Sequence, residues 1–323
     1  MNPTPGDVHV NAPLTNMSLA YVQGNEAFVA DRVFPNIPVQ KQSDRYWTYD
    51  RGHFWRDSMA LRAPATESKG IEYSVDSTPT YYTPVNALHH DIPDELRANA
   101  DSPLSPDRET TLLITQLAMV KREKDWVGKY LTGVTGTWTS AVTGAAGTVW
   151  DNGASDPIAA VRLAKRTIAQ STGVDPNKMV MGRAVFDALL DHPDIVDRIK
   201  YGQTPGSPAL TNAQILAQIF GLDEILTSNA VENVSSEGIA NSFSFIAGKH
   251  ALLVYAAPSP GLMTPSAGYT FSWTGFYGAT AMGFRIKRFR MDSRNSDRVE
   301  IDMAYDQKLV SADLGYQFIN IVT

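Results

Sequence analysis

The chain lacks cysteine and long apolar runs, and each absence excludes a class of protein. Without cysteine there is no disulfide, no thiolate metal site and no cysteine nucleophile. No run approaches the roughly 18 apolar residues that a membrane-spanning helix needs. Residues 1–7 also lack the basic patch and apolar core of a secretory signal. We therefore expect a protein that is made in the cytoplasm and does not enter a membrane.

The chain also lacks an excess of positive charge, because its 323 residues have a formal net charge of −6. Proteins that bind nucleic acid usually carry a basic patch or stripe. Bulk charge therefore does not predict nucleic-acid binding. The length exceeds that of one ordinary domain, so the chain can bury a large core or form two lobes.

Histidine and carboxylate side chains do not form a convincing metal site. The best candidate is His89-His90-Asp91. Adjacent residues on a strand point to opposite faces, so His89 and Asp91 share a face but His90 does not. Two ligands fall short of the three or four that zinc sites use. The sequence predicts no metal and no cofactor.

Catalytic motifs are equally weak. His192 lies between Asp191 and Asp194, which permits an acid–base pair but is more typical of a helix break in which Pro193 opens the next helix and an aspartate caps it. Gly248-Lys249 lacks the further glycines and the following helix of a phosphate-binding loop. We assign no catalytic residue and predict that the chain is not an enzyme.

The N-terminal segment, residues 1–45, reads as an extended arm. Several prolines interrupt it, and each removes a backbone donor and disfavours helix at the preceding residue: Pro3, Pro5, Pro13, Pro35 and Pro38. Such a segment cannot bury Phe34 and Ile37 by itself. We expect it to lie on another surface, and we expect a chain lacking residues 2–40 to stay soluble.

Residues 45–92 predict a projecting β-hairpin. Residues 45–49 are aromatic, residues 71–76 alternate apolar and polar, and a polar middle with Pro64 and Gly70 separates them. Long hairpin loops in a compact protein usually serve function or contact.

The longest predicted helix covers residues 105–131. Ser105 can cap it, and Pro106 suits its first turn. Leu113, Leu117 and Val120 recur at helical spacing. We expect this face to pack on the C-terminal strands that contain Ile301 and Phe318.

The rest of the chain alternates helices and strands. We expect a long loop or irregular hairpin at residues 132–155, then a helix from residue 156 to about 173. A strand at 178–182, two helices divided by Pro193, a third helix near 211–221 and a strand at 224–227 follow. Residues 243–246 and 252–255 predict a hairpin around Gly248. Further strands are expected at residues 269–276, 285–291, 298–305 and 315–322.

The strand at residues 285–291 is basic. A run of Arg and Lys favours phosphate contacts: Arg285, Lys287, Arg288 and Arg290. The alternative is an edge strand whose cations pair with acidic neighbours such as Glu300 and Asp302, within or between subunits. We favour the paired edge strand.

The order of these segments resembles the Hong Kong ninety-seven-type fold of major capsid proteins of tailed double-stranded DNA bacteriophages. The residues that carry the resemblance are 105–131, 179–183 with 189–193, 220–226, 305–310 and 315–320. It implies an α+β fold with an N-terminal arm (1–45) and a projecting β-hairpin, or E-loop (46–92). It also implies a peripheral domain (93–155 and 281–323) with a long spine helix, and an axial domain (156–280) at capsomer centres.

The same resemblance places the arm and the hairpin on neighbouring subunits. Apolar, aromatic and basic residues of the arm, the hairpin and the basic strand then become candidates for the assembly interface: Phe34, Ile37, Tyr46, Trp47, Arg56, Lys69, Tyr73, Arg285 and Arg288. Some family members form Lys–Asn crosslinks between subunits. We do not carry that chemistry to Lys69, because no acidic partner for it is evident.

The implied function is a structural one. Such a chain assembles with itself into the hexamers and pentamers of an icosahedral head, in the host cytoplasm, and encloses double-stranded DNA without reading its sequence. Some family members carry a long N-terminal scaffolding extension, whereas this sequence begins almost directly with the arm. Either the scaffolding protein is separate, as we expect, or such an extension is absent from this sequence. A portal and a decoration protein are further implied partners of the virion.

Three alternatives are open at this stage. An encapsulin uses the same fold to enclose a protein cargo. A tail or decoration protein would form tubes, rings or surface additions instead of closed shells. A hydrolase or other enzyme is disfavoured, because no triad, metal set or phosphate loop is evident.

Overall fold

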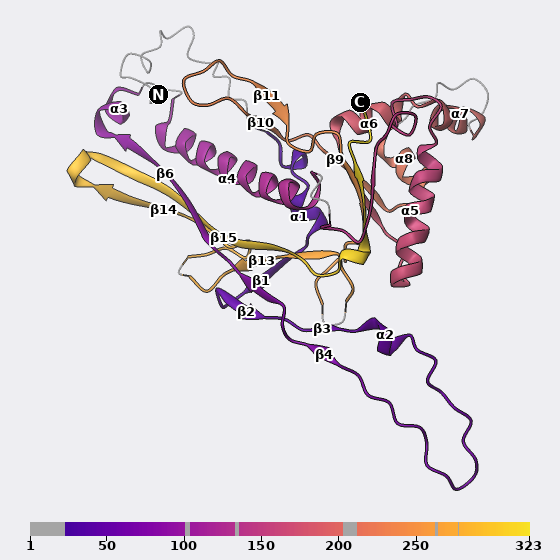
Figure 1. The fold of residues 1–323 in the computed structure, drawn as a ribbon. Helices are drawn as coiled ribbons and strands as arrows, with labels where there is room; N and C mark the ends of the chain where they lie inside the picture. The colour runs from indigo at the N-terminus through magenta and orange to yellow at the C-terminus, as the bar shows by residue number, and fades with distance from the viewer. Residues whose placement is uncertain (1–22, 101–103, 133–135, 203–211, 262–263, 277) are drawn as a thin grey trace.

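The computed structural model describes residues 23–100, 104–132, 136–202, 212–261, 264–276 and 278–323. Two five-stranded sheets form the body, and a thin hairpin projects from it (Figure 1). The fold is α+β, as predicted. None of the helices in these ranges is both long and apolar enough to cross a bilayer.

The first sheet is built around one long strand. Its members are β1 (Asn36–Val39), β6 (Val85–Pro93), β13 (Gly268–Trp273), β14 (Phe284–Met291) and β15 (Ser296–Leu309). Strand β15 pairs antiparallel with β6, β13 and β14, whereas β1 joins the edge of β13 in parallel. The predicted strands near residues 269–276, 285–291 and 298–305 are confirmed.

The long helix α4 (Pro106–Tyr130) packs against this sheet, and its prediction is confirmed. Pro106 occupies its first turn with Asp107 and Glu109, whose negative charges favour a helix N-terminus. Its predicted packing face is wrong, because Leu113 and Leu117 are 51% and 46% exposed.

A neighbouring stripe of α4 faces the sheet instead. Ile114 and Ala118 are buried in one cluster with Ile92, Val299 and Ile301. The helix carries two apolar stripes about 100° apart, as the 3.6-residue repeat requires. Spacing alone did not show which stripe the sheet would cover.

The second sheet has the strand order β7-β16-β12-β8-β9. Its strands are β7 (Ser140–Thr143), β8 (Lys178–Gly182), β9 (Glu224–Ser228), β12 (Ala251–Val254) and β16 (Gly315–Ile319). The accompanying helices are α5 (Pro157–Thr172), α6 (Arg183–Leu190), α7 (Pro193–Gly202) and α8 (Ala213–Phe220). The predicted order of elements across residues 178–228 is confirmed.

Local sequence explains the ends of these helices. The Asp156 side chain accepts a hydrogen bond from the Ala159 amide at 2.8 Å, and Asn212 caps α8 through the Ile215 amide at 2.9 Å. Helix α5 ends at Gly173, which adopts the left-handed conformation with φ of 67°.

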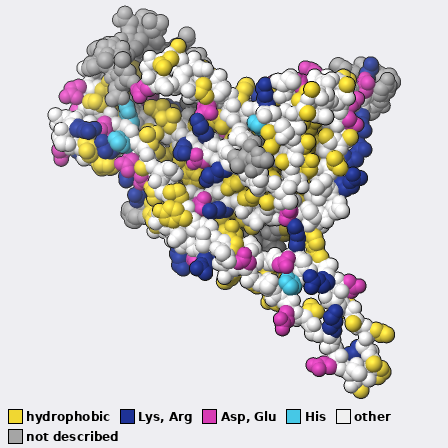
Figure 2. Space-filling model, viewed as in Figure 1, with side chains coloured by type: hydrophobic (Ala, Val, Ile, Leu, Met, Phe, Trp, Pro, Cys, Tyr) yellow, Lys and Arg dark blue, Asp and Glu magenta, His cyan; other side chains and the backbone are white. Residues whose placement is uncertain are grey.

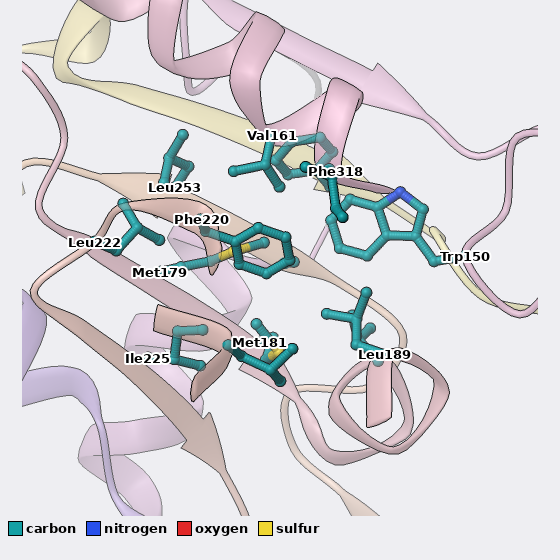
Figure 3. Close-up of a cluster of buried hydrophobic side chains, with 14 of the residues drawn as sticks. Trp150, Val161, Met179, Met181, Leu189, Phe220, Leu222, Ile225, Leu253 and Phe318 are labelled. Atoms are coloured by element: carbon teal, nitrogen blue, oxygen red, sulfur yellow. The ribbon is translucent and has the colours of Figure 1, made fainter. Parts of the chain in front are cut away.

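Helices and sheet enclose the largest apolar cluster (Figure 3). Trp150, Val161, Met179 and Leu189 are fully or nearly fully buried in it, together with Phe318. Phe318 therefore packs in the second sheet and not on α4, which corrects the sequence expectation. Strand pairing groups residues 315–319 with β8 and β12, and groups residues 268–273 with β15.

The predicted hairpin between residues 243–246 and 252–255 is wrong. Strand β11 (Phe243–Phe245) pairs instead with β10 (Val231–Asn233), and β12 pairs with β8 and β16. All of β12 is buried, whereas Phe243 and Phe245 are exposed. An apolar strand without a polar face needs cover on both faces of its sheet. Ala251 and Leu253 of β12 pack in one core cluster, and Leu252 and Val254 pack in another on the opposite face.

The remaining elements are short. They are η1 (Asn25–Ala27), α1 (Ala30–Val33), β2 (Ser43–Arg45), β3 (Thr48–Tyr49), α2 (Arg51–Phe54), β4 (Val75–Asp76), β5 (Thr80–Tyr82), α3 (Asp94–Asn99), η2 (Asp292–Arg294) and η3 (Ala312–Leu314).

Candidate assembly surfaces

The projecting hairpin predicted from the sequence is present. Strand β2 pairs antiparallel with β5, and β3 pairs antiparallel with β4, so residues 43–82 leave the body and return to it. In Figure 1 this excursion extends well beyond both sheets. Two strand pairs of three and two residues cannot form a core of their own.

The outer part of the hairpin is more apolar than predicted. Met59 is 96% exposed, Leu61 is fully exposed and Ile71 is 73% exposed. Figure 2 shows hydrophobic side chains gathered at the end of the projection. Side chains of this size on a thin projection leave a large apolar area in water, which marks an interaction surface.

The five hairpin candidates from the sequence differ in their surroundings. Tyr46 stacks on Phe271 of the same chain, with ring centroids 5.6 Å apart. Trp47 and Tyr73 are 67% and 68% exposed, and Arg56 and Lys69 are exposed as well. Tyr46 therefore anchors the hairpin base, and the other four remain available to a partner.

Polar contacts also fix the start of the hairpin. The Asp50 carboxylate accepts from the Gly52 amide at 2.8 Å and begins α2. Arg51 forms an ion pair with Asp313 at 2.6 Å. The Trp55 ring lies against Gly173, where an added Cβ atom would come within 3.2 Å of it. The base is held on the body, whereas the tip is not.

The N-terminal segment contradicts the sequence expectation from residue 23 onward, while residues 1–22 lie outside the described residues. Phe34 is fully buried in its own subunit, with its ring 5.7 Å from Trp126 and 4.8 Å from Tyr130. Ile37 lies on β1 and packs beside Tyr81 and Phe271.

Phe34 is therefore a core residue and not an interface residue, whereas Ile37 is only partly buried on the edge strand β1 and stays an interface candidate. The reason is that α4 and the edge of β13 already offer a surface on which a proline-rich segment can lie. Deleting residues 2–40 would open this core, so the expected solubility of such a chain is also corrected.

The basic strand β14 pairs with acids of its own subunit. Arg285 contacts Asp302 at 2.8 Å, and Lys287 contacts Glu300 at 2.7 Å. The paired edge strand favoured from the sequence is confirmed, and its partners lie within the chain. These cations hold β14 on β15.

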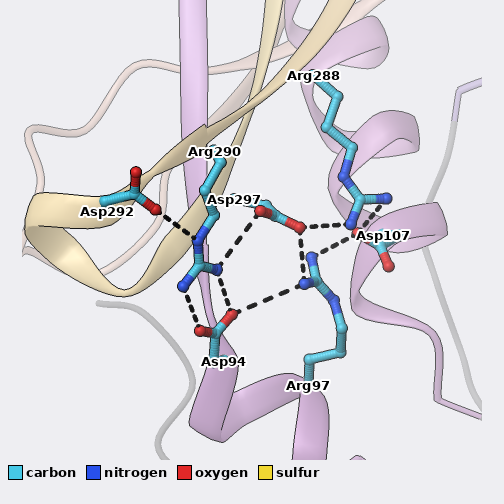
Figure 4. A network of polar contacts seen from close by, with 7 residues as sticks. All are labelled: Asp94, Arg97, Asp107, Arg288, Arg290, Asp292 and Asp297. Atoms are coloured by element: carbon cyan, nitrogen blue, oxygen red, sulfur yellow. Dashed lines mark hydrogen bonds and ion pairs between the residues drawn. The ribbon is translucent and has the colours of Figure 1, made fainter.

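A second part of the pairing was not predicted. Arg288 and Arg97 both contact Asp297, at 2.6 and 2.8 Å, and Arg97 also contacts Asp107 at 2.9 Å. Arg290 binds both oxygens of Asp94 at 2.6 Å. Figure 4 shows these side chains converging from β14, β15, α3 and the start of α4. We call this set the tip network, because it lies where β14 turns into β15; it is distinct from the tip of the projecting hairpin.

The tip network lowers the pKa of its carboxyls. Hydrogen bonds from Arg288 and Arg97 lower the pKa of Asp297 to about 2, against the smaller raising effect of burial. The only sequence signal was the alternation of arginines on β14, which points them to one face. Their partners on α3 and α4 are distant in sequence, so spacing could not identify them.

The histidine candidates have structural partners. Asp91 accepts from Arg298 at 2.6 and 2.8 Å and from Arg294 at 3.0 Å, so guanidinium groups occupy its oxygens. Within the described ranges, no three His, Asp or Glu side chains gather as metal ligands.

His192 is buried, and its Nδ1 accepts from the Asp194 amide at 3.3 Å. Pro193 opens α7 as predicted, but this capping acceptor is His192 itself, not an aspartate. Because Nδ1 accepts, Nε2 carries the proton and faces Ser155 Oγ at 3.3 Å. A protonated Nε2 cannot take a proton from Ser155, so this pair is not set up as nucleophile and base.

Two further sets of exposed apolar side chains were missed by the sequence, one on α4 and one on β11. Leu112, Leu113 and Leu117 of α4 are exposed, and so are Phe243 and Phe245 of β11. An ion pair between Lys124 of α4 and Glu232 of β10 at 2.5 Å holds the two elements side by side. Each of these two sets is a face that a neighbour could cover.

The sequence and the fold are similar to those of known proteins. Residues 137–267 match the family described as phage major capsid protein E. A major capsid protein of Pseudomonas phage JBD67 is 26% identical and covers 97% of both chains. A major capsid protein of Burkholderia phage BcepMu is 22% identical and covers 95% of both. These comparisons confirm the function inferred from the sequence, that of a phage major capsid protein.

Solved structures agree on the fold of this capsid protein. A phage-related protein from Bordetella bronchiseptica has a TM-score of 0.69 and 20% identity, covering 93% of this chain and 94% of that one. The capsid of cyanophage P-SCSP1u has a TM-score of 0.64 and 9% identity, covering 99% and 95%. The Hong Kong ninety-seven-type fold inferred from the sequence is confirmed.

The fold alone does not separate a capsid from an encapsulin. The SrpI encapsulin of Synechococcus elongatus reaches a TM-score of 0.58 at 11% identity, covering 95% of this chain and 93% of that one. The two sequence relatives above, each similar over nearly its whole length, are phage major capsid proteins. This decides between the two alternatives in favour of the phage capsid.

Proposed function

We propose that this capsid protein assembles with itself into hexamers and pentamers that close an icosahedral head around double-stranded DNA. The observation that carries the proposal is the hairpin tip, where Met59, Leu61 and Ile71 have no cover from their own subunit. A surface complementary to this tip elsewhere on an identical chain makes a head-to-tail contact, and such contacts form rings when the rotation between neighbours closes.

We assign roles to the parts inferred from the sequence: the projecting hairpin, the axial domain and the peripheral domain. The projecting part of the predicted 46–92 segment, residues 46–82, lies on a neighbouring subunit and presents Trp47, Arg56, Lys69 and Tyr73 to it. The remaining residues, 85–92, belong to β6 in the first sheet of their own subunit. Residues 156–280 form the axial domain at the capsomer centre. Residues 93–155 and 281–323 form most of the peripheral domain, whose outer end carries the tip network with Arg288, while Arg285 supports the strand behind it. Strands β7 and β16 pair into the second sheet and go with the axial domain, and β13 pairs with β15 and goes with the peripheral domain.

The proposed partners and location are those of a head protein. Assembly takes place in the host cytoplasm and uses a separate scaffolding protein, a portal and a decoration protein. The enclosed DNA is held without sequence-specific contacts. The net charge of −6 is consistent with this, because an acidic lining binds phosphate weakly and does not hinder packing or release. The subunit itself catalyses no reaction.

Electron microscopy of particles from infected cells, in which the scaffolding protein is also made and the tested chain is the only capsid subunit, tests the proposal. We expect closed shells from the wild type and only free subunits or capsomers from the double variant Met59→Asp with Leu61→Asp. Ser68→Asp is the matched control, since it adds a charge to the same exposed loop without removing an apolar side chain.

Normal shells from the double variant would refute the role of the hairpin tip. Tubes or open rings from the wild type would favour a tail component. Co-purified DNA is expected in shells made during infection, and a protein cargo in its place would overturn the head assignment.

A further inference from the structure

Glu123 lies where three segments of the subunit meet. It is on α4 and is only 1% exposed. Its Oε2 accepts hydrogen bonds from the Val29 amide at 3.0 Å and the Ala30 amide at 2.9 Å, at the start of α1. Its Oε1 accepts from Ser228 Oγ, at the end of β9, at 3.1 Å. One carboxyl group therefore ties the N-terminal segment and the second sheet to the long helix.

The charged groups around Glu123 are already paired with each other. Arg122 of α4 contacts Asp31 of α1 at 2.5 Å, and its guanidinium lies 5.3 Å from the ring centre of Tyr305 on β15. Arg32 of α1 is paired with Glu224 of β9. Within the described part of the chain, no cation forms an ion pair with the Glu123 carboxyl. An ionised carboxylate in this position is buried without a counter-charge, which is costly.

The same partners also suit a neutral carboxyl. A proton on Oε1 would be donated to Ser228 Oγ, because a hydroxyl can accept as well as donate. Oε2 would still accept from both amides. Burial is the largest influence here and raises the pKa of Glu123 from 4.5 to about 7, although the three donors act in the opposite direction.

Glu123 borders a cavity. Glu123 lines a space of about 420 Å³ between α1, α4 and the first sheet, together with Asp31 and Arg122. Most of its wall is apolar: Phe28, Ala118, Met119, Phe284, Ile301 and Met303. Water that enters here can hydrate an ionised carboxylate once α1 moves away from α4.

We propose that Glu123 is a proton-binding site whose neutral form holds the N-terminal segment and β9 tightly on α4, and whose ionised form loosens this junction. The inference concerns the single subunit and does not rest on the assembly proposed above. Its direction follows from linkage. A carboxyl with a raised pKa in the folded state stabilises that state below about 4.5, and the stabilisation is lost as the pH rises to about 7.

Equilibrium unfolding of the full chain between pH 5 and 7.5 tests the proposal with Glu123→Gln. The glutamine oxygen can accept from both amides and its NH₂ can donate to Ser228 Oγ, so the variant imitates the neutral carboxyl. Over this window the unfolding constant of the wild type should rise by up to about tenfold per pH unit relative to that of the variant. Glu109→Gln on the exposed side of α4 is the matched control and should follow the wild type.

Hydrogen exchange then locates the effect. After correction for intrinsic exchange, opening at the Val29 and Ala30 amides should increase with pH in the wild type and stay constant in Glu123→Gln. Parallel pH profiles for the two proteins would overturn the proposal. A Glu123→Gln variant that is less stable at every pH would also overturn it, because the ionised carboxylate would then be the form that holds the junction.

Discussion

The N-terminal segment, residues 23–39, and the hairpin, residues 43–82, follow each other in the chain yet meet opposite fates. Both are irregular and carry large apolar side chains. Phe34 is completely buried, whereas Leu61 is completely exposed. The first segment lies against α4 and β13 of its own subunit, and the second extends away from every such surface. An irregular segment becomes core or interface according to the surface within its reach, not according to its composition.

The largest expected effect comes from truncating the buried side chain of the N-terminal segment, Phe34. Phe34→Ala should lower the free energy of unfolding by about 3–5 kcal/mol, because it leaves a cavity between Trp126 and Tyr130. Trp47→Ala removes a larger side chain that is 67% exposed and should change the free subunit by no more than about 0.5 kcal/mol. Urea titration of both variants measures the difference. Equal losses would mean that the hairpin packs on its own subunit.

Helix α4 allows the same comparison between two faces of one element. Ile114→Ala should cost about 2–5 kcal/mol, since Ile114 is 1% exposed and packs on β15. Leu117→Ala should cost about 0.5 kcal/mol or less in the free subunit, because Leu117 is 46% exposed. Thermal unfolding distinguishes the two. A large loss from Leu117→Ala would restore the packing face inferred from the sequence.

The comparisons of Phe34 with Trp47 and of Ile114 with Leu117 show what the sequence could predict. Helix α4, the order of elements in residues 178–228 and the antiparallel pair β14–β15 follow from local signals such as caps, prolines and alternation. The face of α4 that packs does not, because Leu113 and Ile114 are both good core residues and only the sheet decides between them. The location of Phe34 depends on Trp126 and Tyr130, about ninety residues further along the chain.

The candidate surfaces were predictable to a similar extent. Exposure of Trp47, Arg56, Lys69 and Tyr73 follows from a hairpin too thin to cover them. The tip network was not predictable, because Arg97 and Asp297 are 200 positions apart and meet only through β6 and β15. A resemblance to a family supplied the overall fold where pairwise contacts could not be derived.

A smaller effect is expected from acid at the tip network. The pKa of Asp297 is lowered from 3.8 to about 2, so its contribution to stability is present above about 3.8 and is lost as the pH falls through about 2. Asp297→Asn should remove this acid-dependent loss of stability. It should also make the stability of the variant less dependent on salt, because salt screens exposed ion pairs such as those of the tip network. Melting temperatures between pH 2 and 5 measure both effects. An unchanged acid limb in the variant would show that Arg97 and Arg288 gain nothing from this carboxylate.

The smallest effect on the free subunit is expected for the hairpin. Its amide hydrogen exchange should be fast in the free subunit and slow in the assembled shell. Between β4 and α2 the described hairpin has few backbone hydrogen bonds to slow exchange, so its amides should exchange quickly in isolated subunits. In closed shells a neighbour should cover Met59 and Leu61 and slow exchange across residues 55–74. Strand β8 is the internal control, because it is paired on both sides and should be protected in either state. Equal exchange of the hairpin before and after assembly would mean that the tip stays in solvent, and its exposed apolar side chains would then need a partner other than a second copy of this chain.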